Sequence, residues 1–202
     1  MKRLLLVRHA ESELGAVGLV DGDPGRANAL SAAGREQAER LRARLQGQPV
    51  GLCVTTRLQR TRETADLALG GREVPRLVVE ELDEIRFGRW EEQPFEQYAA
   101  WAWTAGPTEP APGGGESRQE VAARFAAGWR RVLERSEQTV LAVVHGLTVR
   151  YTLDAAEGLV PAQRADQVAL AEPYELDERE LRAAVGTLER WAQRPAWRGG
   201  EP

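Results

Sequence analysis

Two short aliphatic runs, Leu4–Val7 and Thr139–Val144, constrain the fold of this chain more than any other feature. Each run is continuous and bounded by polar residues, which indicates a strand that is buried on both faces. Val50–Val54 is a third candidate strand, with Cys53 as a small core residue, and Leu77–Val79 is a fourth. Strands of this kind are typical of a mainly parallel sheet.

Helical patterns lie between these runs. The apolar spacing after Ser31 predicts a helix that this serine caps. Ser117 and Glu120 form a capping box ahead of a second helix, and Leu58–Leu69 and Glu178–Trp191 also show helical periodicity. The alternation of strands and helices predicts an α/β fold, with a mainly parallel central sheet flanked by helices on both faces.

The 202 residues fit a single domain, Met1–Pro202, with two irregular stretches inside it. Val17–Ala29 holds three Gly, one Pro and two Asp, which indicates a loop. Gly88–Gly115 holds three Trp, four Pro and a run of Gly, and we expect a lid-like excursion with a short helix near Phe95–Trp103. The tail Arg194–Pro202 is expected to be frayed.

The charge balance argues against nucleic-acid and membrane partners. The chain has 27 Lys and Arg against 31 Asp and Glu, whereas binders of nucleic acid or anionic membranes need a basic surface. One Cys and two His are too few for a disulfide framework or a cysteine-based zinc site, so we expect no metal and no cofactor. The sequence shows no targeting segment and no apolar stretch of membrane-spanning length, and we expect a cytoplasmic protein.

The two histidines, His9 and His145, each follow directly on one of the two strongest predicted strands. The carboxyl ends of parallel strands meet at one edge of the sheet, which is where open α/β folds bind their ligands. Either histidine alone is more often structural than catalytic. Their common position therefore favours a shared site.

Arginines near the same edge indicate a phosphate ligand. Arg8 precedes the first histidine, and Arg57, Arg60 and Arg62 open the helix that follows the third strand, although a solvated helix face is the commoner role for Arg62. Guanidinium groups bind phosphoryl oxygens bidentately, and a helix N-terminus adds N–H donors. One carboxylate of the acidic run Glu80–Glu84 is a candidate proton donor, but spacing does not select which.

Six sequence blocks follow one another along about residues 3–150: Leu6–Ser12, Leu30–Ala38, Thr56–Ala65, Leu82–Glu91, Gly114–Ser117 and Val144–Gly146. In this order they resemble the histidine phosphatase superfamily, which has the phosphoglycerate-mutase-like fold. The first block is similar to its R-H-G-E-[ST] signature, with Ala10 in place of Gly. The dipeptide R-H alone is uninformative, whereas the ordered set is specific.

The resemblance implies a role for each matching residue. His9 would be the nucleophile that accepts the phosphoryl group as a phosphohistidine. Arg8, Arg60 and His145 would line the phosphate pocket, with His145 also part of the catalytic set. Glu84 would protonate the leaving oxygen and then activate water. Phosphoryl transfer depends mainly on positioning and charge stabilisation, which agrees with this set of residues.

Some positions depart from the family pattern or extend it. Gly15 stands where many members carry Asn, so one phosphate donor is missing or comes from elsewhere. Ser12, Arg57, Phe87 and Trp90 are candidate substrate-binding residues. The Trp-rich excursion would suit a phosphomonoester with an apolar or aromatic leaving group.

The resemblance favours the phosphatase branch, because family mutases are usually longer and more basic around the substrate. We therefore expect a metal-independent phosphomonoesterase (EC 3.1.3.-) that hydrolyses a small phosphorylated metabolite and releases inorganic phosphate. A phosphoglycerate mutase-type phosphotransferase is the alternative. A phosphohistidine protein phosphatase and an inactive phospho-ligand binding module are further alternatives, and a homodimer stays open beside a monomer.

Overall fold

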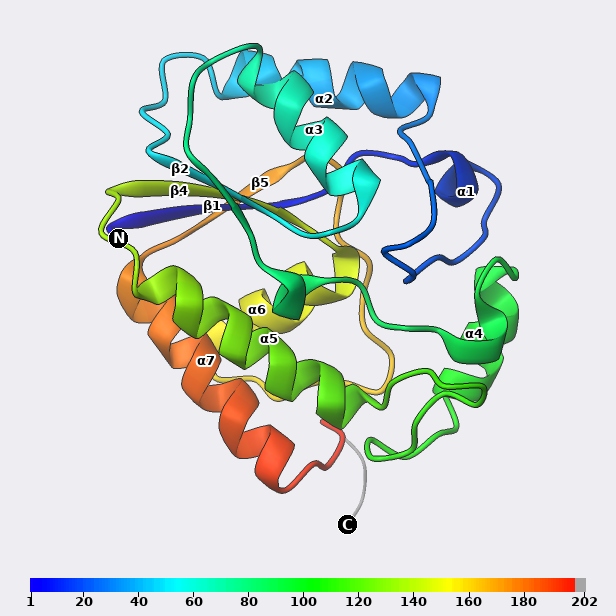
Figure 1. Cartoon of the computed structure of the whole chain (residues 1–202). Helices are drawn as coiled ribbons and strands as arrows, with labels where there is room; N and C mark the ends of the chain where they lie inside the picture. The colour runs from blue at the N-terminus through cyan, green and yellow to red at the C-terminus, as the bar shows by residue number, and fades with distance from the viewer. Residues whose placement is uncertain (199–202) are drawn as a thin grey trace.

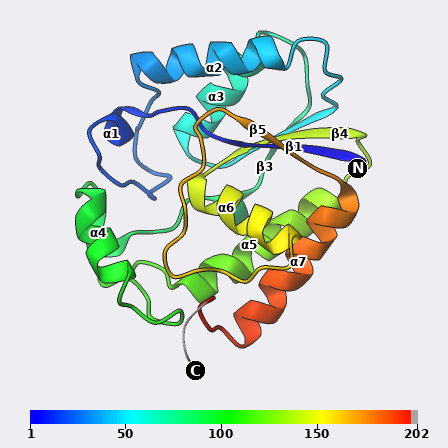
Figure 2. The same cartoon turned by 180° about the vertical axis from the view of Figure 1, so that it is seen from behind.

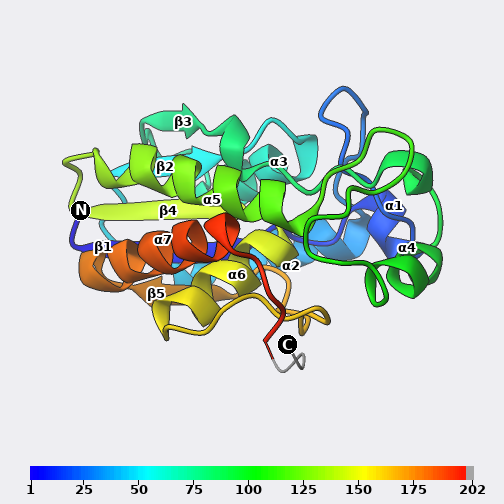
Figure 3. The same cartoon turned by 90° about the horizontal axis from the view of Figure 1, so that it is seen from below.

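A sheet of five strands forms the centre of the computed structural model, which describes residues 1–198. In spatial order the strands are β3 (Arg76–Val78), β2 (Leu52–Thr55), β4 (Thr139–Val144), β1 (Arg3–Arg8) and β5 (Pro173–Leu176), as Figure 3 shows from below. Neighbouring strands pair in parallel except β1 and β5, which are antiparallel. The prediction of a mainly parallel sheet is confirmed, and the four predicted strands lie within two residues of their expected bounds.

Helices cover both faces of this sheet (Figures 1 and 2). They are α2 (Ala32–Arg44) and α3 (Gln59–Leu69) on one face, and α5 (Arg118–Leu133), α6 (Gly146–Ala156) and α7 (Glu178–Gln193) on the other. Alternate residues of β1 enter two separate cores: Leu4 and Leu6 pack with α5 and α7, whereas Leu5 and Val7 pack with α2 and α3. This two-sided burial explains why the strand sequence shows no polar alternation.

Local sequence signals fix where most helices begin. The Ser31 hydroxyl accepts a hydrogen bond from the Gly34 amide at 2.9 Å, and the capping box of Ser117 with Glu120 is formed, as predicted. Two helices were not predicted, the single turn α1 (Glu13–Ala16) and α6. In α6 the first residue is a glycine and the preceding residue gives no side-chain cap, so its start carries no sequence signal.

The edge strand β5 was also not predicted. It pairs with β1 and leaves most of its side chains partly exposed. Pro173 opens the strand and Glu175 is exposed, so the segment has neither an apolar run nor a clean alternation. Beyond α7, residues 194–198 form no helix or strand, and the end of the tail Arg194–Pro202 lies outside the described residues.

The excursion Gly88–Gly115 lies beyond the carboxyl ends of the central strands, close to α1 (Figure 1). It contains the 3-10 turn η2 (Gly88–Trp90) and the expected short helix, α4 (Phe95–Ala102). The Arg89 amide donates to the carbonyl of Pro112 at 2.8 Å, which ties the start of the excursion to its end. A lid-like movement of this segment and the single-domain boundary stay predictions.

Strand pairing brings the two histidines together. β1 and β4 are adjacent and parallel, with Arg8 opposite Val144, so the next residues, His9 and His145, emerge side by side. The His9 amide donates to the Val144 carbonyl at 2.8 Å, which continues the ladder by one bond. The shared position predicted from the sequence therefore follows directly from the register.

None of the helices within residues 1–198 is both long and apolar enough to cross a lipid bilayer. The expected cytoplasmic location stays a prediction.

Candidate active site

His9 is buried at the end of β1 and held in one tautomer. Its Nδ1 lies 2.7 Å from the carbonyl oxygen of Ala10, and because a carbonyl only accepts, Nδ1 carries the proton. The lone pair is then on Nε2, which accepts a hydrogen bond from Nε of Arg60 at 3.1 Å. Burial lowers the pKa of His9 well below its usual value, and the charges of Arg60 and Arg8 lower it further. The imidazole is therefore neutral, with Nε2 turned toward a guanidinium.

Arg60 lies in the first turn of α3 and is almost completely buried. Nη1 donates to Oδ2 of Asp21 at 2.9 Å, and Nη2 donates to the backbone oxygen of the same residue at 2.7 Å. Oδ2 also accepts from Nδ2 of Asn28 at 2.9 Å. Each nitrogen of the guanidinium thus has a partner, and Asp21 and Asn28 are parts of the site that sequence reasoning missed.

His145 is fully buried beside His9, with the ring centroids 5.3 Å apart and the rings edge to face. Its Nε2 lies 2.9 Å from Oγ1 of Thr56, and its Nδ1 lies 3.5 Å from Nη2 of Arg60. Burial lowers its pKa well below the usual value, with Arg60 as the next cause, so this imidazole is neutral too. His145 does not itself line the cavity at this end of the strands, whereas its neighbour His9 does.

Glu84 is the residue of the acidic run Glu80–Glu84 that faces the cavity. Burial raises the pKa of its carboxyl group, against the opposing charge of Arg60, and Oε1 accepts from the Ile85 amide at 3.0 Å. Oε2 lies 3.9 Å from Nδ1 of His145. A carboxyl group with a raised pKa beside a buried arginine suits a proton donor.

Arg124 of α5 holds the backbone that carries Glu84. Its Nη1 donates to the carbonyl oxygens of Glu81 and Asp83, and its Nη2 donates to that of Glu84. The same guanidinium forms a buried ion pair with Glu116, at 2.7 Å from Nε to Oε1. These bonds hold the backbone of this loop against α5.

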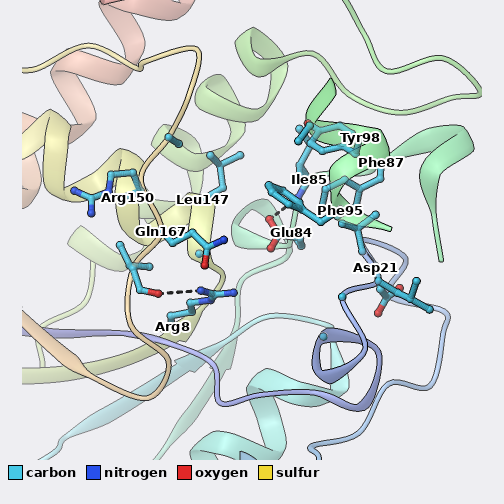
Figure 4. A pocket seen from close by; sticks show the side chains of 18 of the residues that line it. Arg8, Asp21, Glu84, Ile85, Phe87, Phe95, Tyr98, Leu147, Arg150 and Gln167 are labelled. Carbon is cyan, nitrogen blue, oxygen red and sulfur yellow. Dashed lines mark hydrogen bonds between the residues drawn. The ribbon is translucent and has the colours of Figure 1, made fainter. Parts of the chain in front are cut away.

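A cavity of about 540 Å³ opens over this edge of the sheet. In Figure 4, Arg8, Leu147, Arg150 and Gln167 form one wall, and Glu84, Ile85, Phe87, Phe95 and Tyr98 form the other. Arg8 is anchored by Nη1, which donates to the Val168 carbonyl at 2.9 Å. We call Arg8, His9, Arg60, Glu84 and His145 the histidine cluster.

The four candidate substrate-binding residues divide into two pairs. Ser12 and Phe87 line the cavity. Arg57 does not line it: its side chain is half exposed and forms ion pairs with Asp83 and Glu80. Trp90 does not line it either, because its ring is buried against Trp101 at 4.9 Å between centroids. Arg62 is exposed on α3, in agreement with a solvated helix face.

The cavity also borders two positions that bear on the family pattern. Gly15 lines it and brings no side chain, whereas Asn28 lines it with a buried amide that also caps the Leu14 N–H at 3.2 Å. An amide side chain is thus present near the cluster, supplied from a different point of the chain. Within residues 1–198, no group of three His, Cys, Asp or Glu side chains converges as a set of metal ligands.

Comparison with known proteins assigns the class. The family model of the histidine phosphatase superfamily (branch 1) matches residues 4–194, and the chain belongs to this superfamily. The resemblance carried by the six blocks is therefore confirmed.

Two relatives and one solved structure resemble the chain. The adenosylcobalamin/alpha-ribazole phosphatase of Escherichia coli K12 is 32% identical over 154 residues, which cover 71% of this chain and 73% of the relative. Its counterpart from Salmonella typhimurium is 38% identical over 107 residues; this match spans 49% of the chain and about half (52%) of the relative. A solved structure of a putative alpha-ribazole-5'-P phosphatase from E. coli K-12 superposes with a TM-score of 0.76 at 28% identity, over 87% of this chain and 90% of that one. The relatives are phosphatases.

Proposed function

We propose that the chain is a phosphomonoesterase that works through a phosphohistidine intermediate on His9. The observation that carries this proposal is the tautomer of His9: with Nδ1–H bonded to Ala10, the lone pair of a neutral imidazole is on Nε2, beside Arg60. A neutral imidazole can attack phosphorus without a metal, and the neighbouring guanidinium stabilises charge on the phosphoryl oxygens.

The first half-reaction forms a bond from Nε2 of His9 to phosphorus and breaks the bond from phosphorus to the leaving oxygen. Glu84, whose pKa is raised by burial, gives its proton to that oxygen. Arg8 and Arg60 bind the phosphoryl oxygens, and His145 supports them from behind. The Nδ1–H bond to the Ala10 carbonyl stabilises the positive charge that the ring acquires.

The second half-reaction returns the site to its starting state. The Glu84 carboxylate takes a proton from water, whose oxygen attacks phosphorus while the bond to Nε2 breaks. His9 is again neutral, Glu84 is again protonated, and inorganic phosphate leaves. Both half-reactions use the histidine cluster, the Ala10 carbonyl and water, which is the basis for proposing a metal-independent enzyme.

The walls of the cavity support a substrate with a planar or apolar leaving group. Phe95 and Trp103 both line the cavity while keeping 39% and 41% of their surface exposed. Arg164 stacks on the Trp103 ring with its Cζ 4.7 Å from the centroid. Exposed aromatic rings at a cavity mouth favour stacking with a flat group, and relatives named alpha-ribazole phosphatases agree with such a substrate.

The test is a phosphate-release assay on a panel of aryl, alkyl, nucleoside and sugar phosphates. We expect the highest kcat/KM for phosphomonoesters with an aromatic group, and Trp103→Ala should reduce this advantage without abolishing turnover of alkyl phosphates. Preference for plain sugar phosphates would refute the substrate class. Absence of release from every phosphomonoester would refute the phosphatase itself.

A further inference from the structure

Asp21 is a buried carboxylate that forms an ion pair with the buried Arg60 of the histidine cluster. It is only 5% exposed, lines the cavity and comes from the loop between α1 and α2 (Figure 4). Its Oδ2 accepts from both Arg60 and Asn28 at 2.9 Å. On the other oxygen, Oδ1, the Asp23 amide donates at 3.3 Å and Nε of Arg26 lies at 3.6 Å.

The position of this carboxylate has two physical consequences. Its bonds hold the guanidinium of Arg60 so that the third nitrogen, Nε, points at Nε2 of His9. Its negative charge offsets the charge of Arg60 at short range, because a buried ion pair is poorly screened by solvent. A phosphate dianion bound by Arg60 therefore has a carboxylate as its near neighbour and is bound less tightly than by an unpaired guanidinium.

We propose that Asp21 is a positioning residue that orients Arg60 and limits the affinity of the site for inorganic phosphate. The proposal rests on the proposed function in taking phosphate as the ligand. A phosphatase has to release an anion that resembles the transferred group, so a site with unopposed positive charge would hold its product. Asp21 keeps the hydrogen-bond geometry of an arginine site while reducing its net charge.

The substitution Asp21→Asn separates charge from geometry. The amide oxygen can still accept from Arg60 and Asn28, and the backbone carbonyl of residue 21 still accepts from Nη2. What disappears is the negative charge, together with the weak contact from the Asp23 amide and the ion pair with Arg26. Asp23→Asn is the matched control, because Asp23 is an exposed acid of the same loop that does not line the cavity.

The experiment is isothermal titration of inorganic phosphate into the wild type and both variants at one salt concentration. We expect Asp21→Asn to bind phosphate at least about tenfold more tightly, as removal of a like charge at short range requires, and Asp23→Asn to match the wild type. With an aryl phosphate, KM and the inhibition constant of phosphate should fall together. A purely structural role would instead weaken phosphate binding or leave it unchanged, which would overturn the proposal.

Three further cases are decided by the same design. If Asp21→Asn does not fold, Asp21→Ser removes the charge and keeps one acceptor, and the same tightening is required of it. If the wild type releases no phosphate from any ester but Asp21→Asn still binds phosphate more tightly, the proposed function fails and the role of Asp21 stands. If the wild type is an active phosphatase but Asp21→Asn binds phosphate with the same affinity, the proposed function stands and the role of Asp21 fails.

Discussion

Nε of Arg60 donates a hydrogen bond to Nε2 of His9 across 3.1 Å, so a cation and the proposed nucleophile are in direct contact in the free protein. The bond occupies the lone pair that would attack phosphorus. In the proposed mechanism, an arriving phosphoryl oxygen accepts the hydrogen bond from Nε of Arg60 instead, which frees Nε2 and places phosphorus beside it. Substrate binding and activation of the nucleophile are thereby coupled through one guanidinium.

His9→Ala should abolish both turnover and covalent labelling, because in the proposed mechanism the bond to phosphorus forms on Nε2 of this residue. An aryl phosphate quenched within the first turnover should leave an acid-labile, base-stable adduct on a peptide that contains His9, detectable by mass spectrometry. His145→Ala should still form some adduct, at a rate reduced about 10²–10³-fold, as is typical when one preorganised stabilising group is lost. An adduct on His145 would contradict the assignment.

Glu84→Gln should slow the release of poor leaving groups far more than the release of good ones. Alkyl alcohols leave only with a proton, so their release should fall about 10²–10⁴-fold, whereas 4-nitrophenol leaves without one. The measurement is kcat/KM for an alkyl phosphate and for 4-nitrophenyl phosphate in both proteins. Glu81→Gln is the control, since Glu81 pairs with Arg131 outside the cavity. Equal losses on the two substrates would move the acid role to another residue.

The pH profile for alkyl phosphates should be bell-shaped. The pKa of His9 is lowered, so the imidazole stays neutral, and able to attack, until the pH falls below that lowered value. The pKa of Glu84 is raised, so the acid stays protonated to a higher pH than an ordinary carboxyl, and activity falls as the pH rises through it. In Glu84→Gln the alkaline limb should vanish while the acid limb remains. An unchanged alkaline limb would assign it to a different group.

Excess EDTA should leave phosphate release unchanged, because in the proposed mechanism Arg8 and Arg60 supply the charge stabilisation that a metal would otherwise give. The measurement is the initial rate with and without chelator, after dialysis. Loss of activity that Mg²⁺ restores would show that a metal takes part.

Glu116→Ala should destabilise the protein by about 3 kcal/mol, because it leaves a largely buried Arg124 without its ion partner. Glu116 also accepts from the Arg86 amide at 2.9 Å, so the loop toward Glu84 should loosen and kcat should fall as well. Urea unfolding measures the first effect. Glu36→Ala, at an exposed pair with Arg40, should change stability by less than about 0.5 kcal/mol. Equal losses in both variants would contradict the argument.

Features that depend on neighbouring residues could be predicted from the sequence. The aliphatic strands, the capped starts of α2 and α5 and the position of both histidines at strand ends are set by periodicity and by side chains within four residues. Burial of the parallel strands on both faces of the sheet could be predicted because apolar and polar residues do not alternate along them. The pairing of His9 with His145 follows from these features, because the strands that precede the two histidines, β1 and β4, are neighbours in the sheet.

Features that depend on distant contacts appeared only in the folded chain. β5 exists because β1 offers it an edge, not because Pro173–Leu176 favours a strand. Which carboxylate of Glu80–Glu84 enters the cavity is decided by Arg124, which lies 40 residues away. Asp21 looked like an ordinary loop acid, and only the approach of Arg60 from α3 gives it a buried partner. A local sequence pattern indicates which secondary structure a segment favours. The direction and the charge environment of a side chain depend instead on the residues that the tertiary structure packs against it.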